Sequence, residues 1–194
     1  ASGSTAIALG NNTMASGTGS VALGSSSISS NVGSIGIGLS ANASGTNATA
    51  IGPGSIASSE QTIAVGTLAN ASSYAALALG ERTKASGLYS VALGPKANSS
   101  GDMSTALGYM ANASSNYSLA LGDQANASGL FSIAMGTKAS AKNAHSIAMG
   151  YLSLSEGADS IALGESSQSK GSYSVALGLH AKSLDLGGVA IGRD

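Results

Sequence analysis

Side chains that could perform chemistry are few in this chain and do not cluster. The sequence has two histidines, His145 and His180, nine Asp and Glu residues and no cysteine. A metal centre needs several ligands brought together, and nucleophilic catalysis needs a hydroxyl or thiol beside an oriented base. The two histidines fall in different repeats of the chain, and the serines belong to a repeated pattern. We therefore predict no catalytic residue, no metal site and no cofactor.

Large side chains recur at every fourteenth residue in the later part of the chain. They are Tyr89, Met103, Tyr117, Phe131, His145 and, after Asp159, Tyr173. Aromatic side chains contribute strongly at interfaces, so Tyr89, Tyr117, Phe131 and Tyr173 are candidate contacts for a protein ligand. In a second interpretation, these side chains line the rim of a contact between copies of the chain.

Lysines form the other candidate binding set, for acidic ligands: Lys84, Lys96, Lys138 and Lys142. They are interspersed with carboxylates such as Glu81 and Asp123, so the alternative is solubilising charge that also opposes edge-to-edge aggregation. The formal net charge is −1. A nucleic-acid-binding protein would present a basic face, so the composition argues against a nucleic-acid partner.

The elements that position these side chains follow from a strict repeat. A glycine occupies every fourteenth position from Gly10 to Gly192, without insertion or deletion, which gives fourteen copies. The residues before each glycine read as in Ser20-Val21-Ala22-Leu23-Gly24. With Ser20 as position one and Gly24 as position five, this numbering applies to all copies. So short and regular a period predicts a repeat architecture in one continuous domain, residues 1–194.

Each repeat has the pattern of two short strands. Positions two and four are apolar and largely branched, with a small residue between them, and this alternation is typical of a strand. Positions eight and ten are always Ala, Ser or Thr, and positions nine and eleven are mostly polar. Position twelve is Gly, Asn, Asp or Ser, so we expect a turn with a positive φ there. Strand, turn, strand, turn in fourteen residues predicts one coil of a parallel β-solenoid.

The positions of the small residues predict which side chains face inward. We expect positions three and five to face positions eight and ten across a thin interior, which places positions two and four outside. The outward positions include Val21, Leu23, Ile63, Val65, Leu77, Leu79, Val91, Leu93, Leu107, Leu119, Leu121, Ile133, Met135, Ile147, Met149, Ile161, Leu163, Val175 and Leu177. Such a stripe exceeds the apolar patch that a soluble monomer tolerates. Copies of the same chain around a symmetry axis are the expected cover.

Ser-(Val/Ile)-Ala-(Leu/Ile)-Gly followed by Ala-x-Ala-Ser-Gly, on a fourteen-residue step, resembles the YadA-like head of trimeric autotransporter adhesins. Examples are Ser90-Val91-Ala92-Leu93-Gly94 and Ala125-Asn126-Ala127-Ser128-Gly129. The resemblance covers essentially the whole chain. It implies an all-β, left-handed parallel β-roll assembled as a homotrimer, with positions two and four in the trimer core.

The resemblance also implies a role and a location. Such heads bind collagen, fibronectin, laminin or host cell surfaces, and they belong to bacterial surface proteins anchored in the outer membrane by another part of the chain. This sequence contains no apolar run of membrane-spanning length. We therefore expect a non-catalytic adhesive head that is a fragment of a longer surface protein. The alternative is a rigid spacer that displays a binding domain located elsewhere.

Overall fold

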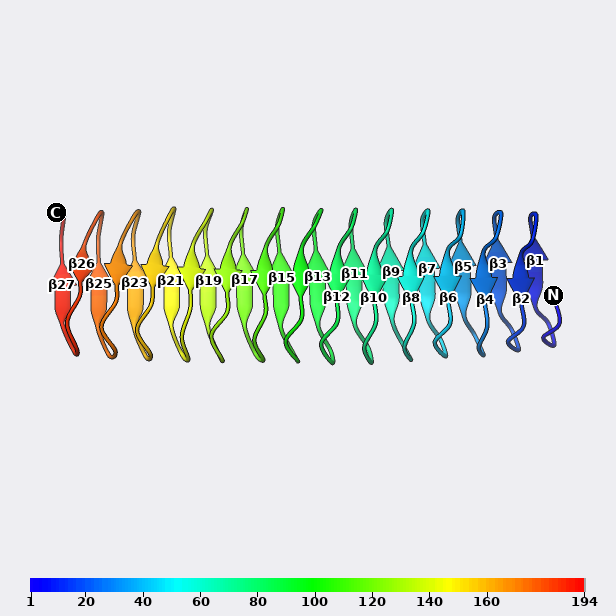
Figure 1. The fold of residues 1–194 in the computed structure, drawn as a ribbon, viewed down its shortest axis with the longest axis horizontal. Coiled ribbons are helices and arrows are strands. Elements are labelled where there is room, and N and C mark those ends of the chain that lie inside the picture. Colours follow the sequence, from blue (N-terminus) through cyan, green and yellow to red (C-terminus); the bar gives the residue numbers. More distant parts are fainter. Residues whose placement is uncertain (194) are drawn as a thin grey trace. The chain divides into compact units, whose positions relative to one another are not determined.

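The computed structural model describes residues 1–193, and all the regular structure in this range is β-strand. The chain falls into two compact units, Ala1–Lys96 and Ala97–Asp194. Each unit is a parallel β-solenoid in which successive coils stack side by side (Figure 1). The predicted fold class is thus confirmed. The prediction of a single continuous domain stays a prediction.

The first unit contains two parallel sheets. The sheet of first strands contains β1 (Ile7–Leu9), β3 (Val21–Leu23), β5 (Ile35–Ile37), β7 (Thr49–Ile51), β9 (Ile63–Val65), β11 (Leu77–Leu79) and β13 (Val91–Leu93). The sheet of second strands contains β2 (Met14–Ala15), β4 (Ile28–Ser29), β6 (Asn42–Ala43), β8 (Ile56–Ala57), β10 (Asn70–Ala71) and β12 (Lys84–Ala85).

The second unit repeats this arrangement. Its first strands are β15 (Thr105–Leu107), β17 (Leu119–Leu121), β19 (Ile133–Met135), β21 (Ile147–Met149), β23 (Ile161–Leu163), β25 (Val175–Leu177) and β27 (Val189–Ile191). Its second strands are β14 (Asn98–Ser99), β16 (Asn112–Ala113), β18 (Asn126–Ala127), β20 (Ser140–Ala141), β22 (Leu154–Ser155), β24 (Gln168–Ser169) and β26 (Lys182–Ser183).

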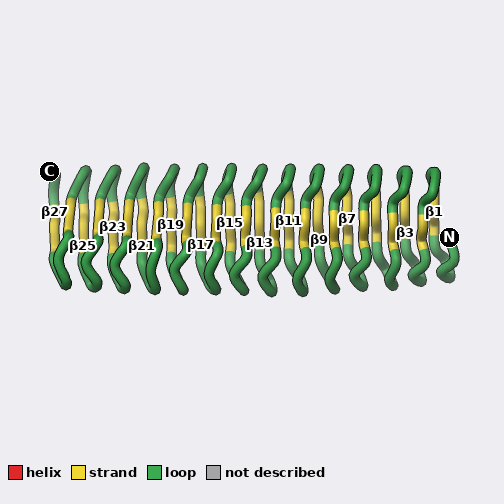
Figure 2. Tube along the Cα trace, in the orientation of Figure 1, coloured by secondary structure: helices red, strands yellow, loops and turns green. Residues whose placement is uncertain are grey.

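Neighbouring coils pair like with like. Val21 lies beside Ile35 and Ala22 beside Gly36, so each residue meets its equivalent one repeat later. Figure 2 shows the strands of each coil in yellow, joined by green turns at both ends. Identical columns of side chains therefore run along each unit at about 4.8 Å spacing, the distance between hydrogen-bonded strands.

The interior of each unit contains only small side chains. Ala22, Ala106 and Ala120 at position three have no exposed surface, and the largest fully buried side chains are those of Thr62 and Thr83. Positions eight and ten are also buried, as expected, for example Ser27 and Ser29. Because aromatic and long aliphatic residues are excluded from this space, the two sheets pack at close range.

Position one faces the interior together with position three. The sequence pattern predicts this orientation for positions three and five. Ser34 and Ser146 at position one are fully buried, and each hydroxyl donates to the carbonyl oxygen of position twelve, at 2.7 and 2.6 Å. A buried hydroxyl is tolerated when it is hydrogen-bonded. Serine is therefore part of the core here. At Ser34 and Ser146 its side chain closes the turn that precedes the first strand, whereas the buried hydroxyls of Ser20, Ser90 and Ser132 have no hydrogen-bond partner.

Position five proves to be a turn residue at the end of the first strand. Gly24 is half-buried and has a φ of 119°, a left-handed conformation that favours glycine. A Cβ atom on Gly24 would lie 2.7 Å from the carbonyl oxygen of Gly38, the equivalent residue of the next coil. The recurring glycine therefore meets two requirements, a positive φ and close stacking of adjacent coils.

The prediction of a positive φ at position twelve is wrong. The left-handed residues outside position five lie at positions seven and fourteen, such as Lys138 with φ 58° and Phe131 with φ 56°. Gly45 at position twelve has no such φ, but a Cβ atom there would collide with the carbonyl group of Ser59 in the next coil. Small residues at position twelve thus reflect close packing between coils.

Candidate functional site

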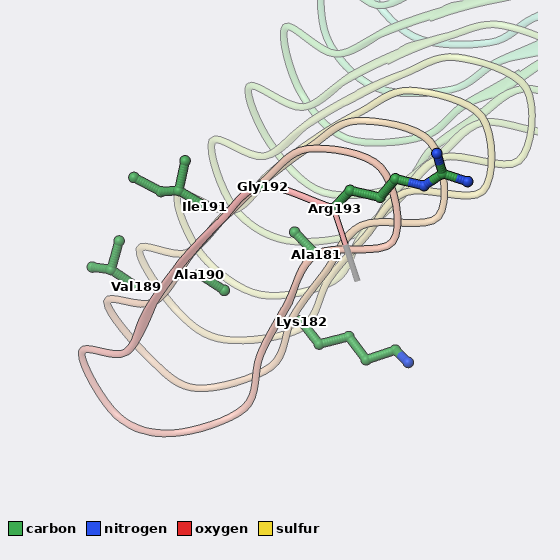
Figure 3. A pocket seen from close by; sticks show the side chains of 7 residues that line it. All are labelled: Ala181, Lys182, Val189, Ala190, Ile191, Gly192 and Arg193. Atoms are coloured by element: carbon green, nitrogen blue, oxygen red, sulfur yellow. The ribbon is translucent and has the colours of Figure 1, made fainter.

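The outer face of the first strands carries an apolar stripe made by positions two and four. The strands show the burial pattern of a half-exposed, a buried and a half-exposed residue, as in β17 and β19. Figure 3 shows the same arrangement in the last coil, where Val189 and Ile191 point away from the coil while Ala190 points into it. The prediction that these side chains face outward is therefore correct within each unit. The assembly that would cover them stays a proposal.

Exposure along the stripe is substantial for such large apolar side chains. Ile63, Leu107 and Met149 have relative exposures of 41%, 39% and 38%. All three lie within a unit and not at a chain end. Fully burying a side chain of this size stabilises a protein by about 1.5–3 kcal/mol. The stripe therefore leaves a large apolar surface exposed in the single chain, and burying that surface would be strongly favourable.

The outer face of the second strands is polar from β14 to β20, whereas Met14, Ile28, Ile56 and Leu154 make it mixed in other coils. Asn98 donates from its amide nitrogen to the side-chain oxygen of Asn112 at 2.8 Å, and Asn112 donates to Asn126 at 2.7 Å. This amide ladder satisfies polar side chains within its own column. It also identifies the second sheet as the face suited to solvent.

One charged column continues this polar face. The Nζ atom of Lys142 lies 2.6 Å from Oε1 of Glu156, and Nζ of Lys170 lies 3.8 Å from Oε2 of the same carboxylate. The hydrogen bond from Lys142 lowers the pKa of Glu156 below its usual value; burial opposes this shift and the positive charges of both lysines add to it. Lys142, a candidate ligand contact, is thus engaged in an ion pair.

This ion pair predicts a pH-dependent stability. Because the pKa of Glu156 is lower in the folded chain, its carboxylate stabilises the fold above pH 4.5, and that contribution is lost as pH falls through the lowered pKa. Glu156→Gln should therefore destabilise at pH 7 by at most about 1 kcal/mol, the range for surface pairs. Thermal unfolding measured from pH 7 to pH 3 should show that the difference in stability between the Glu156→Gln variant and the original protein disappears at low pH. Glu165→Gln, which removes a carboxylate outside this ion pair, is the control. A deficit that is constant with pH would contradict the assignment.

The other candidate lysines do not join Lys142 in a basic surface. Lys138 lies in the turn before β20, whereas Lys142 follows that strand. Lys96 occupies the equivalent turn position in the first unit, with φ 58°, and Lys84 lies on β12 with its side chain exposed. Lys84 lies at position nine and Lys142 at position eleven, whereas Lys96 and Lys138 both lie at position seven. This spread over three positions favours the interpretation of dispersed solubilising charge.

The aromatic residues of position fourteen do come together in the second unit. The rings of Tyr117 and Phe131 stack with centroids 4.7 Å apart and an interplanar angle of 12°, and Phe131 stacks on His145 at 5.5 Å and 20°. The Nδ1 atom of His145 lies 2.9 Å from Oδ1 of Asp159. We call Tyr117, Phe131 and His145 the ring column. The fourteen-residue spacing was the signal for these contacts, including the His145–Asp159 pair that sequence reasoning missed.

The remaining aromatic candidates lie outside the ring column. Tyr173 occupies the same position two coils later and is 65% exposed. Tyr89, in the first unit, packs edge-on against Tyr74 with ring centroids 5.4 Å apart. Both have the positive φ that is common to position fourteen. Every aromatic candidate therefore projects from a turn.

A hollow of about 460 Å³ lies at the end of the last coil, lined by residues that include Lys182, Ile191 and Arg193 (Figure 3). It is formed by the uncovered faces of β26 and β27. Within residues 1–193, no group of three or more His, Asp or Glu side chains is arranged to hold a metal ion. Over the same range, no helix has the length and hydropathy of a membrane span.

Comparison with known proteins agrees with the residue pattern. The sequence model of the YadA head domain repeat, which comprises two copies, matches residues 1–27, 29–55, 43–69, 57–80, 71–97, 99–125, 127–153 and 155–181. Among curated proteins, no similar sequence is found. One similar solved structure is the collagen-binding domain of the Yersinia adhesin YadA, with 22% identity and a TM-score of 0.37 over 98% of this chain and 82% of that one. With repeats of one family matched along nearly its whole length, this chain belongs to the YadA head domain family.

Proposed function

We propose that this chain is the adhesive head of a bacterial trimeric surface protein and that it attaches to extracellular matrix proteins or host cells. Its family is one of cell-surface adhesin modules. The observation that carries the finer proposal is the apolar stripe, which is present in every coil of both units. Within residues 1–193 every strand belongs to one of the two stacked sheets, and none of them covers the stripe.

Three copies, the number implied by the family resemblance, would cover the stripes against one another. Such an assembly would present the polar second sheets and the turns in three identical sets. Repeated weak contacts along three faces give strong overall binding, because linked binding events occur at high effective concentration. Attachment by this route requires no catalytic group, and none is proposed.

The test is adhesion of the purified protein to surfaces coated with collagen, fibronectin or laminin, and to host cells. We expect saturable binding whose apparent affinity falls by about 10²-fold or more when the coat is so sparse that each assembly can make only one contact, as multivalency requires. Binding that is equally strong on dense and sparse coats would contradict the multivalent mechanism. Absence of binding to every matrix protein and cell type would favour the alternative, a rigid spacer.

A further inference from the structure

The ring column is an exposed ridge at the turns of the second unit. Tyr117 and Phe131 keep relative exposures of 47% and 46% although their rings stack on one another. The ridge runs across successive coils and ends at the His145–Asp159 pair. Large aromatic side chains that remain half-exposed in a folded chain call for an explanation beyond packing.

The turn itself does not favour these residues. Tyr117, Phe131 and His145 have φ values of 57°, 56° and 54°, a region that favours glycine and asparagine and is unfavourable for bulky residues. In the first unit the same position holds Gly19, Gly33 and Asn47, which are of the favoured kind, but also Thr5, Gln61, Ala75 and Tyr89. A positive φ at non-glycine residues is thus common to both units, and what distinguishes the ring column is the stacking of its side chains.

Position fourteen differs from the apolar stripe in composition. Positions two and four keep similar sizes from coil to coil, as Val, Ile, Leu or Met with two Thr exceptions. Position fourteen instead varies from Gly33 to Phe131. The mass of the ring variant tested below shows whether the ring column also takes part in a contact between copies.

The geometry of the rings restricts the class of ligand. Their faces are covered by mutual stacking, so a sugar, which would stack on an open ring face, has no platform there. The ammonium group of Lys142 is paired with Glu156, and His145 lies within hydrogen-bond distance of Asp159, so a polyanion meets no basic patch. What the ridge presents is ring edges, which are the electropositive part of an aromatic ring, and the Tyr117 hydroxyl. Backbone carbonyl oxygens and apolar side chains complement such a surface.

We propose that the ring column is the specificity-determining contact for a polypeptide ligand, which receives the ridge in a groove with exposed backbone carbonyls. This inference rests on the proposed adhesive function and assigns it to one column of the second unit. It also identifies the coils that contact the ligand. The coils around Tyr117 to His145 bind, and the coils with Gly19, Gly33 and Asn47 act as spacer.

The experiment replaces the rings without disturbing the turns. Tyr117→Asn with Phe131→Asn removes two rings and introduces a residue that tolerates the left-handed conformation. We expect at least a tenfold loss of binding to collagen- or fibronectin-coated surfaces, with unchanged thermal stability and unchanged oligomeric mass. The matched control is Gln61→Asn with Ala75→Asn at the same position of the first unit, which should bind like the original protein.

The outcomes separate the two proposals. If the original protein binds none of the protein-coated surfaces, the proposed function fails and the ring column loses its ligand. If it binds and the double Asn variant at 117 and 131 binds equally well, only the inference about the ring column is overturned. Heparin and vesicles of phosphatidylserine serve as further probes. Binding to either of these that depends on the rings, without binding to protein, would overturn the assignment of a polypeptide ligand.

Discussion

Ala106→Leu combined with Ala120→Leu is expected to disrupt the fold of the second unit. Both alanines are fully buried at position three, on β15 and β17, between two sheets that enclose only small side chains. The available space is shown at Gly36, the equivalent position in β5, where a Cβ atom would lie 2.7 Å from the carbonyl oxygen of Ile28. A leucine extends well beyond Cβ, so the sheets would have to separate.

Overpacking of this kind destabilises by about 1–3 kcal/mol per site, and two neighbouring sites should give about 2–6 kcal/mol. The measurement is thermal unfolding followed by circular dichroism, with loss of β signal at a lower temperature. Thr49→Leu with Thr105→Leu is the matched control, because it adds leucines at position two, which faces outward. Equal stability of the alanine variant and the original protein would show that inside and outside are reversed.

Leu107→Asp combined with Leu121→Asp is expected to prevent assembly. Both leucines lie at position four on the apolar stripe, and Leu107 is 39% exposed in the single chain. In the proposed trimer each would be buried against another copy. Three copies would then bury six unpaired carboxylates, and an uncompensated buried charge costs several kcal/mol. The assembly should therefore be lost rather than weakened.

Light scattering coupled to gel filtration measures the mass directly. Ser100→Asp with Ser114→Asp introduces the same charges on the exposed polar face, and it should leave the mass unchanged. A variant at 107 and 121 that keeps the mass of the original protein would refute the assignment of the stripe as an interface. A soluble, fully folded single chain would refute the further claim that the stripe must be covered.

Most of the fold can be predicted from the sequence because the repeat constrains it so strongly. The alternation at Val21-Ala22-Leu23 gives the strand, the fourteen-residue step gives the coil, and the all-small positions eight and ten identify the interior. The inward serine at position one could not be assigned from the sequence, because polarity alone places such a residue outside. It is buried where its hydroxyl donates within the turn, as from Ser34 to Asn31, and also where the hydroxyl has no partner, as at Ser20.

The turns were the least predictable part. The sequence shows Gly, Asn, Asp or Ser at position twelve, which are the usual residues of a positive φ, yet φ is not positive there, and close approach of adjacent coils accounts for glycines such as Gly45. The positions with a positive φ hold residues such as Phe131 and Lys138, whose types give no sign of it. For the candidate site, spacing predicts that Tyr117 and Phe131 share a column, but the stacking of their rings depends on side-chain rotamers.

The charged column of Lys142, Glu156 and Lys170 has a consequence for how the chain folds. The coils of the stack are nearly identical. A strand displaced by one whole repeat therefore contacts the same alanine and the same pair of apolar residues as in the correct stack. The sheets alone do not distinguish correct stacking from a stack in which one coil is omitted. The charges do distinguish them. If the coil that carries Glu156 were left out, Lys142 would lie beside Lys170, and attraction would become repulsion. Charges of alternating sign along one column thus make an incorrectly stacked solenoid less stable than the correct one, which the nearly identical coils alone would not do.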